Sequence, residues 1–172
     1  MLDSQFQLFS RGVTYLLNIS ICLFFHTEFM TGPDYDSLKD ALILPSNSLF
    51  LRFRALFTLK SLGTNEAIAV ISCAFKPTEK SALFKHECAY VLGQMNSMFA
   101  VPILAKLLGD LDEDQMCRHE AAESLGAIGT SVSAEDRNYI KTILEGFAQD
   151  KVQVVKETVE LALDLLKFHV NL

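Results

Sequence analysis

The chain of 172 residues contains no tryptophan and has four cysteines, Cys22, Cys73, Cys88 and Cys117. None of them forms a C-x-x-C pair, and this absence counts against a zinc site. We therefore expect reduced, partly buried thiols of an intracellular protein. The alternative for Cys88 and Cys117, which lie in helical patterns, is ligation of a soft metal.

The chain also lacks an excess of basic charge. Its formal net charge is −6 and its pI is about 5.2. Phosphate binding requires a basic face, so nucleic acid is excluded as the main partner. The acidic balance suits a basic protein partner. The sequence has no Gly-rich phosphate loop and no nucleophile elbow, which argues against nucleotide-dependent and serine-hydrolase chemistry.

A long apolar run is missing as well. Residues 13–25 are largely apolar, but about 13 residues are too few for a helix to span a bilayer, which takes about 20. No small-residue cleavage site follows them. We predict two parts: an apolar leader at 1–29 and a folded domain at 30–172. The leader is interpreted as a mis-annotated start before Met30, with an appended helix or a membrane or secretory signal as alternatives.

The rest of the chain shows helical spacing of apolar residues and few strand signals. Leu-Gly pairs at 62–63, 92–93 and 125–126 recur at intervals of 30 and 33 residues. A fourth copy, at 155–163, has lost the Gly. Partner helices are predicted at 65–75, 100–108 and 138–148. This pattern predicts an all-α protein, an α-solenoid of about four helical hairpins.

The glycines and the apolar positions of the repeat have structural roles in this interpretation. Gly63, Gly93 and Gly129 are expected to end helices in the left-handed conformation or to permit close helix approach. The expected core residues are Phe53, Phe57, Leu59, Leu62, Ile68, Ile71, Leu83, Val91, Leu92, Ile103, Leu107, Leu125, Ile128, Ile143, Leu144, Val159 and Leu163.

Two His-Glu pairs exceed what packing requires. His86-Glu87 and His119-Glu120 are 33 residues apart, and each His lies seven residues before the Gly of a Leu-Gly pair. Adjacent helix residues point about 100° apart, so one His-Glu pair does not easily chelate a single ion. Equivalent residues of neighbouring repeats do face the same way, on helices about 8–10 Å apart.

We therefore predict that His86 and His119 share one metal ion. Two histidines and a carboxylate are the ligands of non-haem Fe(II) oxygenases. The alternative is that both histidines are helix-surface residues paired with carboxylates.

Three segments carry a resemblance to a known family. They are RFRALFTL at 52–59, ALFKHECAYVLGQM at 82–95 and RHEAAESLGAIG at 118–129. Over residues 36–168 the chain resembles the deoxyhypusine hydroxylases, which are di-iron monooxygenases. The resemblance implies HEAT-like (E-Z type) helical-hairpin repeats.

The resemblance also implies a function and a site. Members of the family hydroxylate the deoxyhypusine residue of translation initiation factor 5A with molecular oxygen, at two Fe(II) ions held by four His-Glu motifs. His86 and His119 would bind one iron and Glu87 the other. Glu120 would be a ligand, an outer-shell group or a contact of the substrate amine. Glu87 and Glu120 are thus the expected catalytic residues of a cytoplasmic enzyme with no membrane association.

The chain departs from the family in carrying two of the four motifs. We expect either a missing C-terminal half or a homodimer that completes the site, and little turnover by a lone monomer. A non-catalytic HEAT scaffold that binds a protein partner is the alternative function. A bilin-lyase-type repeat protein is a third.

Overall fold

The computed structural model describes residues 32–170 and, for side chains, residues 32–168. Between them lie helices and no strand, which confirms the all-α prediction. The helices form four successive hairpins, the predicted number. Their bounds are α2 (Tyr35–Ile43) with α3 (Leu49–Leu62), α4 (Asn65–Ser72) with α5 (Ala82–Gln94), α6 (Val101–Gly109) with α7 (Gln115–Gly129), and α8 (Ala134–Glu145) with α9 (Gln153–Val170), plus a short 3-10 helix, Met98–Ala100.

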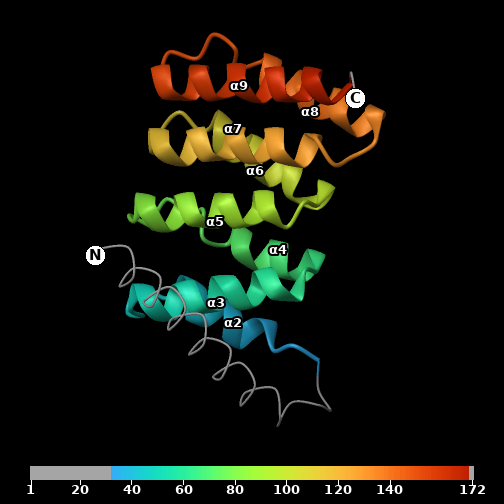
Figure 1. Cartoon of the computed structure of the whole chain (residues 1–172). Helices are drawn as coiled ribbons and strands as arrows, with labels where there is room; N and C mark the ends of the chain where they lie inside the picture. Colours follow the sequence, from blue (N-terminus) through green and yellow to red (C-terminus); the bar gives the residue numbers. More distant parts are fainter. Residues whose placement is uncertain (1–31, 171–172) are drawn as a thin grey trace, which may run out of the picture. The chain divides into compact units, whose positions relative to one another are not determined.

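The described helices form two layers. Figure 1 shows α3, α5, α7 and α9 stacked side by side, with α4, α6 and α8 behind them. Each hairpin buries one face against its neighbours, as a solenoid must. The second helices of successive hairpins are therefore adjacent, and equivalent residues on them point in the same direction.

Capping residues explain where several helices begin. The side chains of Ser48, Thr64 and Ser81 accept hydrogen bonds from backbone N–H groups in the first turns of α3, α4 and α5. Such caps satisfy donors that have no partner within the helix. Ser133 does the same for α8, so this helix begins at Ala134 and not at the predicted residue 138.

The glycines divide between the two expected roles. Gly63 has a φ of 66° and ends α3 in the left-handed conformation. Gly93 lies inside α5, where a β-carbon would come within 2.3 Å of Ser124 Oγ. Gly129 ends α7 without a positive φ, and a β-carbon there would lie 2.5 Å from Leu166 Cδ2. Gly93 and Gly129 therefore permit close helix approach.

Most of the predicted core is buried or half-buried, but two of its members are not. Phe57 is 42% exposed and Leu83 is 63% exposed. Both belong to helices of the same layer, and on these helices neighbouring residues fill the core instead: Leu56 and Phe84 are fully buried. The prediction for Phe57 and Leu83 was wrong because an apolar run on a helix reaches beyond the face that is buried.

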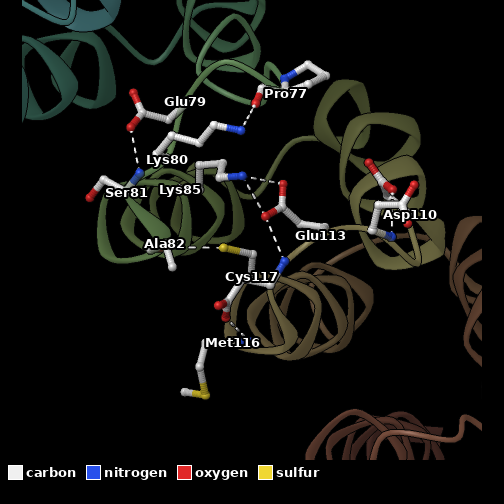
Figure 2. Close-up of polar contacts among 12 residues, drawn as sticks. Pro77, Glu79, Lys80, Ser81, Ala82, Lys85, Asp110, Glu113, Met116 and Cys117 are labelled. Carbon is white, nitrogen blue, oxygen red and sulfur yellow. Dashed lines mark hydrogen bonds and ion pairs between the residues drawn. The ribbon is translucent and has the colours of Figure 1, made fainter.

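A series of buried ion pairs links each hairpin to the next. Arg52 of α3 pairs with Glu79, Lys85 of α5 with Glu113, and Arg118 of α7 with Asp150. Each acidic residue lies between the two helices of the following hairpin. Figure 2 shows Lys85 directed at Glu113, with both carboxylate oxygens 2.6 Å from Nζ.

These three basic residues immediately precede equivalent positions on their helices. The residues that follow them are Phe53, His86 and His119. The ion pairs thus fix how α3, α5 and α7 are rotated about their axes at the positions of Phe53, His86 and His119.

The cysteines of the described part behave as predicted. Cys73, Cys88 and Cys117 are free thiols, and the last two are buried. Burial raises the pKa of Cys88 well above its usual value and that of Cys117 to about 12. Cys22 and the predicted leader lie outside the described residues, so the boundary at residue 30 stays a prediction. None of the helices between residues 32 and 170 combines the length and apolar character that a membrane crossing requires.

Candidate metal centre

The repeat brings the two histidines together. His86 lies on α5 and His119 at the equivalent position of α7, and their ring centroids are 6.0 Å apart. Both side chains are half-buried. Gly93 makes this possible because a larger residue there would hold the two helices apart.

Glu120 completes a group of three. Its Oε2 lies 3.1 Å from His86 Nε2, and its side chain is only 6% exposed. One ligand atom each from His86, His119 and Glu120 lie within 4.8 Å of one another. Metal–ligand distances of about 2.0–2.2 Å place ligand atoms up to about 4 Å apart, so small side-chain rotations suffice to bind one ion.

Glu87 is not part of this group. It is half-buried and adjacent to His86 on α5, and its negative charge contributes to raising the pKa of Glu120. The Glu87 side chain points away from that of His86 because neighbouring residues on a helix are rotated by about 100°. The predicted assignment of Glu87 to a second iron stays a prediction.

The environment of Glu120 disfavours a bare carboxylate. Burial, followed by the charges of Glu123 and Glu87, raises its pKa to about 7, although a hydrogen bond from Ser124 opposes the shift. The charged residues that produce this shift are both acidic. A metal cation would compensate for the burial of this carboxylate and for the nearby negative charge.

His119 is suited to the neutral form that binds metals. Burial lowers its pKa and the proximity of His86 lowers it further, while Glu123 opposes the shift. Its Nδ1 lies 2.9 Å from the hydroxyl of Thr158 on α9. A neutral imidazole is the ligand form of histidine, because protonation removes the lone pair. The donor set of the three residues thus fits a divalent first-row metal.

Three residues at the site were not predicted from the sequence. Ser124 donates a hydrogen bond to the carbonyl of Ala89 (3.0 Å) and lies 3.3 Å from Glu120 Oε1. Glu123 is exposed and shares a helix face with His119, four residues earlier, a spacing that could have revealed it. Thr158 belongs to the fourth repeat copy, which has no histidine, and no pattern indicated it.

Comparison with known proteins places this fold in a family. Residues 77–164 match the family of HEAT repeats. The chain belongs to the HEAT-repeat family. Both His-Glu pairs lie within the matched segment.

Individual relatives of this HEAT-repeat chain share one name. The chain is 44% identical to human deoxyhypusine hydroxylase over 139 residues, which are 81% of the chain and 43% of the human protein. It is 49% identical to the deoxyhypusine hydroxylase of Drosophila melanogaster over 117 residues, which are 68% of the chain and 36% of the fly protein. The resemblance to this family is thereby confirmed. The chain spans less than half the length of either relative.

A solved structure agrees with this result. Human deoxyhypusine hydroxylase in complex with glycerol superposes with a TM-score of 0.71 at 43% identity, covering 80% of this chain and 45% of the human one. The likeness therefore holds for the sequence as well as for the arrangement of helices.

Proposed function

We propose that this chain is the iron-binding, N-terminal half of a deoxyhypusine hydroxylase-type monooxygenase. The proposed substrate is the deoxyhypusine residue of translation initiation factor 5A. The observation that carries the proposal is the convergence of His86, His119 and Glu120 on two adjacent helices. Relatives at 41–49% identity that share the name deoxyhypusine hydroxylase support the choice of reaction.

His86, His119 and Glu120 would hold one iron, and Glu87 would reach a second. Iron bound at this site would supply the activation of molecular oxygen for hydroxylation. The side chains of the chain itself have simpler tasks. The buried carboxylate of Glu120 favours a cation, and the half-buried imidazoles bring neutral nitrogen ligands to it.

The acidic residues around the site suit a cationic substrate. Glu123 is exposed and Glu87 half-buried, so both can contact a ligand from solvent. A deoxyhypusine side chain carries amine groups that are protonated at neutral pH and would be attracted to these carboxylates. A cytoplasmic location follows from the choice of a translation factor as the substrate.

The proposed site needs more ligands than the described residues provide. Two His-Glu motifs lie on α5 and α7, and the family resemblance implies four. The remaining two would come from a C-terminal half or from a second copy of this chain, related by a two-fold axis.

Iron content and molar mass of the full chain test the proposal. We expect iron to bind stoichiometrically, and about one iron per chain in a dimer would indicate a shared two-iron site. The variants His86→Ala and His119→Ala should lose iron and keep their helical circular dichroism. Glu145→Gln, an exposed position on α8, is the control and should bind iron like the wild type.

Iron that persists in both histidine variants would contradict the metal site. A wild-type chain that binds no iron but captures a peptide would favour the non-catalytic scaffold. Turnover is measured separately, on a peptide with the deoxyhypusine residue, with and without a C-terminal half supplied from a relative. Hydroxylation only with that half present would support the proposal that this chain is one half of the enzyme.

A further inference from the structure

The ring of His119 makes a contact that the metal site itself does not explain. Its Nδ1 lies 2.9 Å from Oγ1 of Thr158, a residue of α9 in the next hairpin. For His86 the described polar contact is a different one, from Nε2 to Glu120. The two histidines of the proposed site are therefore held in different ways.

The Thr158 hydroxyl has a second partner. Oγ1 donates to the carbonyl of Val154, one turn earlier on α9, at 2.8 Å. A carbonyl only accepts, so this bond uses the single hydroxyl hydrogen. With the hydrogen in this bond, Oγ1 can only accept from His119, and Nδ1 of His119 carries the hydrogen.

This arrangement favours one tautomer of His119. In a neutral imidazole one nitrogen carries the hydrogen and the other the lone pair. With the hydrogen on Nδ1, the lone pair is on Nε2. Histidines that bind metals commonly donate their other ring N–H to a nearby acceptor, which orients the ring and increases its basicity.

The close packing of the α9 and α7 backbones brings Thr158 to His119. Gly126, two turns after His119, lies so close to α9 that a β-carbon on it would come within 2.8 Å of Ala162 Cβ. Ala162 is one turn after Thr158. Thr158 is buried at this contact between the helices.

We propose that Thr158 is a positioning residue of the metal site: its hydroxyl holds the His119 ring in the Nδ1–H form and leaves Nε2 for the metal. This inference rests on the proposed function for its purpose and on the two hydrogen bonds for its geometry. Thr158 itself contacts neither metal nor substrate.

Two readouts on the full chain test the inference. The first is the tautomer of His119 in the metal-free, ¹⁵N-labelled protein at pH 8, read from long-range ¹H–¹⁵N correlations and assigned with His119→Gln. The second is affinity for Co(II), followed by visible absorption. The variants are Thr158→Val, which removes the hydroxyl, and Thr158→Ser, which keeps it.

Thr142→Val is the matched control. Thr142 on α8 makes the same own-helix bond, 2.9 Å to the carbonyl of Asn138, but it is exposed. We expect Nδ1–H in the wild type and a shift toward Nε2–H in Thr158→Val. Co(II) affinity should fall by about 10- to 100-fold in Thr158→Val. Thr158→Ser and Thr142→Val should resemble the wild type.

Nε2–H in the wild type, or an unchanged tautomer in Thr158→Val, would overturn the inference. A changed tautomer with unchanged Co(II) affinity would overturn the role of Thr158 in metal binding. If the wild type binds neither Co(II) nor iron, the proposed function fails and the purpose of the contact fails with it. The tautomer measurement still decides the geometry, because it needs no metal.

Discussion

Gly93 of α5 lies so close to Ser124 of α7 that a β-carbon on Gly93 would come 2.3 Å from Ser124 Oγ and 2.7 Å from its Cβ. Ser124 in turn donates to the carbonyl of Ala89 on α5. A side chain at position 93 would therefore force a shift at the contact between the two helices that carry His86 and His119.

We predict that Gly93→Ala lowers the free energy of unfolding by about 1–3 kcal/mol, because the added methyl group forces the helices apart. Iron affinity should fall as well, since His86 and Glu120 lie on opposite sides of this contact. Urea denaturation and an iron titration measure the two effects. In the control Gly109→Ala the new methyl group would meet Phe147 at an ordinary 3.5 Å, so a neutral or slightly stabilising change is expected. Equal losses in both variants would contradict the prediction.

The Arg118–Asp150 pair should contribute strongly to stability. Both side chains are less than 10% exposed, and Arg118 also donates from Nε to the carbonyl of Leu108. Asp150→Asn leaves the cation buried without its counter-charge and should cost about 3–5 kcal/mol at neutral pH.

The effect of Asp150→Asn should depend on pH. The hydrogen bond and charge of Arg118 lower the pKa of Asp150 in the folded protein. Its contribution is therefore present above the unfolded aspartate pKa of about 4, and it is lost as pH falls through the folded value. The wild-type and variant denaturation curves should converge in acid. Asp164→Asn, in an exposed pair with Lys167, should change little at any pH.

Glu120 should make the stability of the metal-free protein fall, and not rise, as the pH increases. Its folded pKa of about 7 lies above the usual value of 4.5, so the metal-free folded state binds the proton more tightly than the unfolded state does. Stability then falls as pH rises from about 5 to about 7, by roughly 2–3 kcal/mol. Glu120→Gln removes this loss, so its stability relative to the wild type should increase over that range when chelator is present. Parallel pH profiles of the two proteins would contradict the prediction.

The exposure of Leu83 is tested by a pair of substitutions on α5. Leu83→Gln should change the free energy of unfolding by no more than about 0.5 kcal/mol, because the side chain is 63% exposed. Leu92→Ala removes a fully buried side chain and should cost about 2–5 kcal/mol. A large loss in Leu83→Gln would show that this position is covered in solution.

The sequence predicted the repeat well because the signal was local and recurrent. The interval of 33 residues between His86 and His119 placed them at equivalent positions of adjacent helices, which is where the structure has them. The start of α8 was predicted four residues late because the N-cap at Ser133 was not recognised.

Other parts of the site could not be predicted from spacing. Thr158 contacts His119 across 39 residues, from a repeat copy that has lost the histidine. Its role depends on the rotation of α9 against α7, which is set by Gly126 and Ala162 and not by the periodicity of either helix. The raised pKa of Glu120 likewise depends on burial between helices, which the exposed Glu123 three residues later does not share.

The last hairpin holds two of these contacts at once: Asp150 neutralises Arg118, and Thr158 binds His119. Undocking of this hairpin would therefore remove from α7 both the counter-ion of Arg118 and the hydrogen-bond partner of His119. By thermodynamic linkage, a metal on His86, His119 and Glu120 would oppose that event although these three ligands lie on α5 and α7. Amide hydrogen exchange along α9 would then slow when the metal binds, so the local opening of the terminal repeat reports on an ion held one helix away.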